Sequence, residues 1–93
     1  MAVTVYIPTP FRRATQNRDR VVAEAGSVGE LLDRLEASYA DLKGLVRNAG
    51  GEVHHHVNIY VNSEAIEALG GLATALRDGD EVTIIPALAG GRR

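Results

Sequence analysis

The residues best suited by type and spacing to do chemistry stand at the C-terminal end of the chain. The sequence PALAGGRR places Gly90 and Gly91 after a short apolar run and ahead of Arg92 and Arg93. Glycine orders less readily than other residues, but without a Cβ it passes narrow channels and adopts dihedrals closed to other residues. Five extended residues span about 16 Å, enough to enter a cleft of another protein. The competing interpretation is a disordered end without a role.

Residues 54–56 form a run of three histidines. In a strand, His54 and His56 share one face and could hold a metal ion between them. A zinc site needs more ligands, and no third ligand stands nearby in the sequence. We therefore interpret the run as a solvated entrance to the next strand and predict no metal site.

The remaining polar motifs are typical of turns. Asp78 and Asp80 could act as paired carboxylates, but in the sequence RDGD they predict a turn. The glycine pairs at 50–51 and 70–71 lack the spacing and the lysine of a phosphate loop. The chain has no cysteine, which excludes disulfides, thiolate ligands and a cysteine nucleophile. We expect no catalytic side chain and no cofactor.

Patterns of period two near both ends of the chain predict strands. In VTVYI, three apolar residues alternate with Thr4 and Tyr6, and Pro8 and Pro10 stop the strand. The polar residues 11–19 predict a turn. The predicted strands cover residues 3–7, 20–25, 56–62 and 81–86, with a short one near 65–66.

One long helix is predicted in the middle of the chain. Ser27 and Glu30 have the spacing of a capping box, which marks a helix start. An apolar stripe at helical spacing follows, made of Val28, Leu31, Leu32, Leu35 and Tyr39. Leu42, Leu45 and Val46 continue it weakly, as a second short helical piece, and residues 72–76 predict a single helical turn.

Composition indicates one small globular domain. The chain has 93 residues, of which 45% are hydrophobic, and a net charge of −2. That charge gives no electrostatic reason to expect nucleic acid or an anionic membrane as partner. No secretory signal is recognisable, and we expect a cytoplasmic protein. The element order predicts an α+β domain at 1–86, with a mixed sheet crossed on one face by the helix, and a flexible tail at 87–93 that projects from a sheet edge.

The motifs VTVYIP, VNIYVN and GGLATALRDGDEVTIIPALAGG, in a chain of about this length, resemble the ThiS/MoaD family of sulfur carriers. The likeness is greatest to the CysO type, which serves cysteine biosynthesis. It implies the ubiquitin-like β-grasp fold. It also implies a carrier, not an enzyme, whose terminal glycine is adenylated by a ubiquitin-activating-type enzyme that uses ATP. The adenylate is then converted to a thiocarboxylate, and the sulfur passes to a biosynthetic enzyme of the cysteine, thiamin or molybdopterin type.

Carried onto this sequence, the resemblance makes Gly91 the reactive residue and Gly90 its companion. The family's active form ends at the second glycine, whereas this chain continues for two residues, roughly 7 Å when extended. The resemblance implies that a zinc-dependent JAMM-type peptidase cuts between Gly91 and Arg92. If it does not, this chain is not activated.

The sheet face opposite the helix is predicted to be a docking surface. If Val5, Ile59 and Ile84 point into the core, strict alternation places Tyr6, Tyr60 and Ile85 on the open face. Three large, partly apolar side chains there exceed what solubility needs, which favours docking of the activating enzyme over incidental exposure.

Two other functions remain open from the sequence. A ubiquitin-like modifier attached through Gly91 to target lysines also needs a free diglycine. Lys43 is the only lysine of the chain, so self-linked chains are limited. The third possibility is a plain binding domain with an inert tail.

Overall fold

The computed structural model describes residues 2–86 of the chain. The predicted tail at 87–93, with Gly90, Gly91 and Arg92, lies outside the described residues. Short 3₁₀-helices are labelled η. The elements are β1 (Ala2–Tyr6), η1 (Thr9–Thr15), β2 (Arg20–Glu24), α1 (Val28–Ser38), η2 (Ala40–Leu42), β3 (Val57–Val61), β4 (Glu64–Ala65), η3 (Ile66–Ala68), η4 (Gly71–Ala73) and β5 (Glu81–Pro86).

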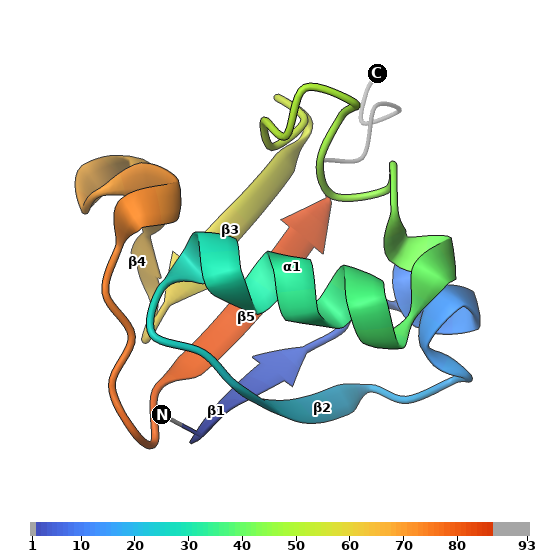
Figure 1. Cartoon of the computed structure of the whole chain (residues 1–93), viewed down its shortest axis with the longest axis horizontal. Coiled ribbons are helices and arrows are strands. Elements are labelled where there is room, and N and C mark those ends of the chain that lie inside the picture. The colour runs from blue at the N-terminus through green and yellow to red at the C-terminus, as the bar shows by residue number, and fades with distance from the viewer. Residues whose placement is uncertain (1, 87–93) are drawn as a thin grey trace.

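The strands form one mixed sheet in the order β2-β1-β5-β3-β4. β1 and β5 run parallel, and the three other neighbouring pairs are antiparallel. Figure 1 shows α1 lying across one face of this sheet. The predicted architecture, a mixed sheet with one main helix on one face, is therefore confirmed.

β5 is the central strand, between β1 and β3. The expectation that the chain would leave the sheet from an edge is therefore wrong. Val82 is 0% exposed and Ile84 is 2% exposed, so β5 is anchored in the core from one face. Alternation in the sequence indicates which face of the sheet a residue occupies, but it does not indicate which strands are neighbours. The position of β5 within the sheet therefore could not be predicted from alternation.

The start of α1 follows the predicted capping box. The Glu30 backbone N–H donates to Ser27 Oγ at 3.2 Å, and Glu30 Oε1 accepts from the backbone N–H of Gly26. The Glu30 carboxylate thus reaches one residue further back than the N-cap. The helix ends at Ser38, with Tyr39 as its C-cap.

The core lies between α1 and the sheet. The helix contributes Val28, Leu31, Leu32 and Leu35, all at most 2% exposed. The sheet contributes the inward side chains of its three central strands, which are Val3, Val5, Val57, Ile59, Val61, Val82 and Ile84. Apolar burial on this scale is the main stabilising term for a domain of this size.

The segment predicted as a polar turn is a 3₁₀-helix, η1. Pro10 lies in its first turn, where the missing N–H of proline costs nothing. Phe11 and Thr15 point inward and are buried. The Thr15 hydroxyl lies 3.2 Å from the Arg12 carbonyl and 2.9 Å from the Arg18 carbonyl, so it has acceptors in the interior. Because most of the residues around Phe11 and Thr15 are polar, the sequence pattern did not predict that these two side chains are buried.

The other helical segments are short. The second helical piece predicted after α1 is η2, which ends at Leu42. Leu42 and Val46 are buried, whereas Leu45 is 36% exposed. The helical turn predicted at 72–76 lies slightly earlier, as η4. Within residues 2–86, no helix has the length and apolar character to cross a bilayer.

Candidate functional site

The described chain ends where β5 ends, at Pro86. Pro86 lies opposite Val57 of β3 in the antiparallel register. The predicted reactive residues Gly90 and Gly91 and the predicted cleavage site before Arg92 begin four residues further along the sequence. Their roles stay predictions. The structure does establish that they follow a strand bonded on both sides and buried on one face.

Tyr6, Thr83 and Tyr60 form a row across the open face of the sheet, which we call the tyrosine row. In the register of β1 with β5, Tyr6 lies opposite Thr83, and in the register of β3 with β5, Tyr60 lies opposite the same threonine. Both tyrosines are partly exposed. The predicted placement of Tyr6 and Tyr60 on the face away from α1 is confirmed.

Ile85 lies on the same face, between the tyrosine row and Pro86 along β5. Its neighbour across the strands is Asn58, and its side chain is 45% exposed. The Tyr6 hydroxyl donates to Glu81 Oε2 at 3.4 Å. The surface therefore combines apolar bodies with polar tips, which suits contact with another protein. Docking by Tyr6, Tyr60 and Ile85 stays a prediction.

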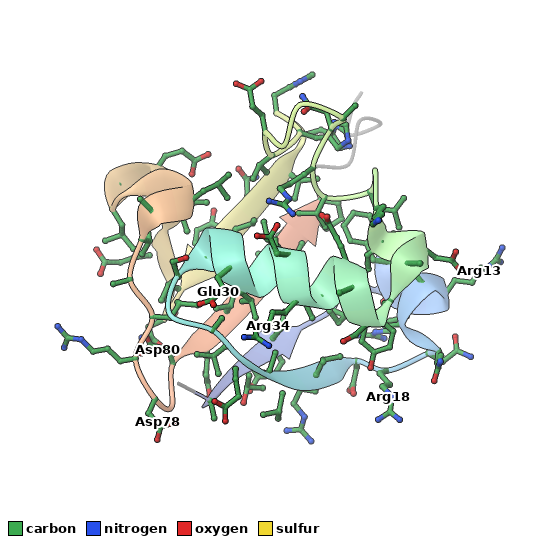
Figure 2. The ribbon with its side chains drawn as sticks, viewed as in Figure 1. Arg13, Arg18, Glu30, Arg34, Asp78 and Asp80 are labelled. Carbon is green, nitrogen blue, oxygen red and sulfur yellow. The ribbon has the colours of Figure 1, made fainter. Side chains whose placement is uncertain are left out.

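The turn before β5 is fixed by carboxylates, as the sequence RDGD predicts. Asp80 accepts from the Arg77 backbone N–H at 2.8 Å and from Asn62 Nδ2 at 2.9 Å. These hydrogen bonds lower the pKa of Asp80. Asp78 Oδ1 accepts from the Ala2 backbone N–H at 3.0 Å. Figure 2 shows both aspartates at this turn, which holds the starts of β1 and β5 together.

The histidine run lies just before β3 and does not form part of it. The rings of His54 and His56 stack with centroids 5.0 Å apart, and His54 Nε2 lies 2.9 Å from the Gly44 carbonyl oxygen. Among residues 2–86, no group of three or more histidines, cysteines, aspartates or glutamates is arranged to hold a metal ion. The contact with Gly44 gives this run a structural role in the loop.

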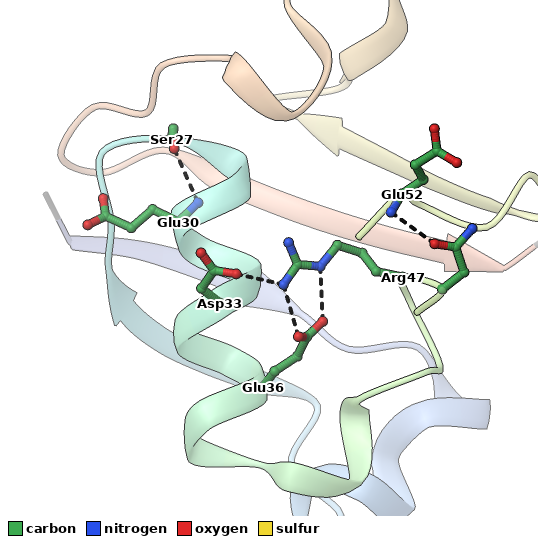
Figure 3. Close-up of polar contacts among 7 residues, drawn as sticks. Ser27, Glu30, Asp33, Glu36, Arg47 and Glu52 are labelled. Carbon is green, nitrogen blue, oxygen red and sulfur yellow. Dashed lines mark hydrogen bonds and ion pairs between the residues drawn. The ribbon is translucent and has the colours of Figure 1, made fainter. Parts of the chain in front are cut away.

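Arg47 fixes the long connection between η2 and β3 to the helix. Its Nε donates to Glu36 Oε2 at 3.1 Å, and its Nη2 donates to Glu36 Oε1 at 2.9 Å and to Asp33 Oδ1 at 2.7 Å. Figure 3 shows this fork between the connection and α1. A hollow of about 550 Å³ beside it is lined by these three side chains together with residues of the connection, among them Lys43. Both carboxylates of the fork accept hydrogen bonds from Arg47, which gives them a structural role.

Sequence patterns did not single out Thr83, Val22 or Arg47. Thr83, which joins the two tyrosines, and Val22, which is 70% exposed on β2, follow from the same alternation that identified Tyr6. Arg47 gives no local signal, because its partners precede it by 11 and 14 residues on another element.

A mixed five-stranded sheet crossed by one main helix, with a partly apolar open face, defines the class of small ubiquitin-like β-grasp proteins. A solved structure of this class, CysO in its complex with BexX from Amycolatopsis orientalis, superposes with a TM-score of 0.89 at 39% identity and covers 96% of this chain and 99% of that one.

The particular family follows from the sequence match. The ThiS family model matches residues 5–91, and the chain belongs to the ThiS family. It is 45% identical over 93 residues to Sulfur carrier protein CysO of Mycobacterium tuberculosis, covering 98% of this chain and 100% of that protein. It is also 45% identical over 71 residues to Small archaeal modifier protein 3 of Haloferax volcanii, covering 75% of each. The named relatives are carriers or modifiers and not enzymes.

Proposed function

We propose that this protein is a sulfur carrier whose working group is the carboxylate of Gly91. The observation that carries the proposal is the extent of the family match, which runs to Gly91 and stops before Arg92. The full-length likeness to Sulfur carrier protein CysO supports it and favours an acceptor of the cysteine-biosynthesis type over the thiamin or molybdopterin type.

The chemistry has two steps, both catalysed by a partner. In the first, a Gly91 carboxylate oxygen attacks the α-phosphorus of ATP, and pyrophosphate leaves. In the second, hydrosulfide attacks the acyl carbon and AMP leaves, which yields the thiocarboxylate without any change of oxidation state. A biosynthetic enzyme then takes the sulfur. The carrier is a co-substrate in both steps, and ATP belongs to the activating enzyme.

The fold suits this role because it delivers a chain end from a fixed point. Val82 and Ile84 lock β5 into the core, so the position of Pro86 is set by the whole sheet. The docking surface of Tyr6, Tyr60 and Ile85 leads along β5 toward that point. A partner that contacts this surface therefore holds the root of the segment that carries Gly91. The CysO of A. orientalis was solved in complex with BexX, which supports binding of a protein partner.

In this proposal the chain ending at Arg93 is a precursor. An amide-linked Gly91 has no carboxylate to adenylate, and the two arginines would have to be desolvated in a tight channel. A JAMM-type metallopeptidase hydrolyses the bond between Gly91 and Arg92. The processed carrier then acts in the cytoplasm.

The test compares two forms of the protein, one ending at Arg93 and one at Gly91. Each is given ATP and the cognate activating enzyme, and pyrophosphate release is measured. Only the Gly91 form should release pyrophosphate, and added peptidase should rescue the longer form. A matched control ends at Gly90 and tests whether position 91 itself is required. Equal adenylation of the uncut Arg93 form would disprove both the precursor and the assignment of Gly91.

The likeness to Small archaeal modifier protein 3 supports a second candidate function, a protein modifier conjugated through Gly91. Mass spectrometry separates the two. A carrier gains the mass difference of one sulfur for one oxygen at its C-terminus. A modifier leaves Gly-Gly branches on lysines of other proteins.

A further inference from the structure

Three arginines gather at the end of β1, and we call Arg12, Arg18 and Arg20 the arginine corner. Arg12 Nε donates a hydrogen bond at 3.1 Å to the carbonyl oxygen of Ile7, the residue that follows β1. Arg20 lies opposite Tyr6, the last residue of β1, in the antiparallel register with β2. Arg18 and Arg20 are exposed, and Arg12 is partly exposed.

The backbone around Thr15 is folded so that Arg12 and Arg18 lie together. Thr15 is 0% exposed, and its Oγ1 lies 3.2 Å from the Arg12 carbonyl oxygen and 2.9 Å from the Arg18 carbonyl oxygen. Gln16 and Asn17 have φ values of 58° and 64°, in the left-handed region that residues other than glycine seldom adopt. A buried hydroxyl and two left-handed residues therefore hold the backbone of Arg18 beside that of Arg12.

The charges of the arginine corner have no partner among the described residues. None of its three guanidinium groups forms an ion pair with a carboxylate of residues 2–86. By contrast, Arg34 and Arg47 both pair with carboxylates of α1. The region is basic, because residues 8–22 contain four arginines and a single acidic residue.

That acidic residue, Asp19, lies on the other face of the sheet from Arg20. The Ile7 N–H donates to the Asp19 carbonyl at 2.9 Å, which continues the register of β1 with β2 by one residue. The Ile7 side chain is buried in the core, and directly opposed residues of two strands share a face. Asp19 is therefore on the helix side, whereas Arg20 is on the open face with Tyr6. Arg13, the fourth arginine, lines two hollows together with an exposed aspartate of η2.

The start of β1 carries the opposite charge. Asp78 Oδ1 accepts from the Ala2 backbone N–H at 3.0 Å, and Glu81 is the first residue of β5, the parallel neighbour of β1. From Ala2 to Ile7 a strand spans about 17 Å. Figure 2 shows Arg18 and Asp78 on opposite sides of the molecule. The sheet is therefore acidic at the start of β1 and basic at its end.

The basic end is also the end at which β5 finishes. β5 runs parallel to β1, and Tyr6 lies opposite Thr83, three residues before Pro86. On its other side Tyr6 lies opposite Arg20, so the arginine corner continues the tyrosine row onto β2. A partner that contacts Tyr6 and receives the segment carrying Gly91 therefore meets the arginine corner.

We propose that the arginine corner is the electrostatic part of the docking surface and pairs with a carboxylate-rich rim on the activating enzyme. The inference rests on the proposed function, because it names the chemistry of the surface that the carrier meets. Guanidinium groups suit such a rim, since they stay charged and bind a carboxylate with two parallel hydrogen bonds. The same rim repels the acidic start of β1. The two ends together orient the carrier so that the end of β5 faces the enzyme.

A nucleic acid fits the corner less well than a protein surface does. The phosphates of a nucleic acid repeat along its length, whereas the carboxylates of Asp78 and Glu81 lie about 17 Å away along the same strands. The net charge of the whole chain is also negative, at −2. A short acidic surface on a protein matches the small size of the corner.

The test is surface plasmon resonance with the cognate activating enzyme immobilised and no ATP present. The full 93-residue chain and the form ending at Gly91 are both measured from low to high salt. Arg18→Glu and Arg20→Glu should each lower the association rate constant about tenfold at low salt, with a smaller change in the dissociation rate constant. The association rate constants of both variants should depend less steeply on salt than that of the unchanged protein.

Arg77→Glu is the matched control, because Arg77 is exposed at the acidic end and the net charge changes by the same amount. It should leave the association rate constant unchanged, and amide NMR spectra of each variant check that the fold is intact. The proposal is overturned if all the variants associate like the unchanged protein, if association does not depend on salt, or if neither form binds.

Adenylation separates the arginine corner from the proposed function. If the Gly91 form binds as expected but releases no pyrophosphate when ATP is added, the proposed function fails and the corner stands. If pyrophosphate release at low carrier concentration is equal for the unchanged protein and for Arg18→Glu and Arg20→Glu, the function stands and the corner fails. If these two variants lose binding to a single-stranded oligonucleotide but keep binding to the enzyme, the partner is a nucleic acid and the proposal is wrong.

Discussion

Replacing Arg47 by methionine tests whether the connection between η2 and β3 is held on α1 by charge. Methionine keeps an apolar stem of similar length but removes the guanidinium and its three hydrogen bonds to Glu36 and Asp33. The Arg47 side chain is 13% exposed, and that of Glu36 is 17% exposed. The variant therefore leaves a mostly buried carboxylate without its partner.

The expected cost follows from this burial. Exposed ion pairs contribute about 0–1 kcal/mol, whereas breaking a fully buried pair costs about 3–5 kcal/mol. Asp33, with a side chain 70% exposed, contributes little, so the bidentate contact with Glu36 dominates. An intermediate cost of about 2 kcal/mol is expected, which corresponds to a fall in Tm of about 10 °C for a domain of this size.

Urea unfolding followed by circular dichroism measures this cost. A double-mutant cycle with Glu36→Gln isolates the pair, and its coupling energy should exceed about 1 kcal/mol. Arg34→Met is the matched control, because Arg34 lies 3.9 Å from Glu30 with both side chains about half exposed. The control should cost less than about 0.5 kcal/mol. If Arg47→Met costs no more than this control, or if the cycle is additive, the buried fork does not hold the connection.

Three further predictions concern the core, the turn and the open face. Leu35→Ala should destabilise the fold by about 2–5 kcal/mol in urea unfolding, and a cost under about 0.5 kcal/mol would mean that the helix stripe does not carry the core. Hydrogen bonds hold the pKa of Asp80 in the folded protein below its ordinary value. The charged carboxylate therefore stabilises the fold at pH values above the ordinary pKa, and this stabilisation is lost as the pH falls through the pKa of the folded protein. Urea midpoints of Asp80→Asn should therefore fall less than those of the unchanged protein between about pH 5 and pH 2, and parallel curves would contradict this. Tyr60→Ala and Ile85→Asp should slow adenylation while the far-ultraviolet circular dichroism spectrum and the urea midpoint show an intact fold, and normal rates in both would remove the open face from docking.

Local patterns were sufficient to predict the parts of the fold that depend on neighbours in sequence. The alternation in VNIYV placed Ile59 inside and Tyr60 outside, because side chains of a strand alternate between faces. The pair Ser27 and Glu30 located the start of α1 because both hydrogen bonds of the box close within four residues. The turn at Asp80 was predictable for the same reason.

Features that depend on distant partners were not predictable in this way. The central position of β5 results from its parallel pairing with β1, whose residues are more than 70 positions away. Arg47 finds Glu36 across a connection without periodicity. Phe11 is buried in a segment whose polar composition predicts a turn, because burial there depends on what the rest of the chain packs against it. In each of these three cases the structure depends on contacts between residues that are far apart in the sequence, and local patterns do not report such contacts.

The position of β5 links the two predicted parts of the site. Its inward residues Val82 and Ile84 are locked in the core, while its outward residues Thr83 and Ile85 lie on the open face. A partner that contacts the open face, as proposed, would contact the central strand of the sheet, which is paired with β1 on one side and β3 on the other. Pro86 follows Ile85 directly, so the end of that strand lies next to the proposed docking surface. The core thus does more than stabilise the domain, because it fixes where the segment that carries Gly91 begins.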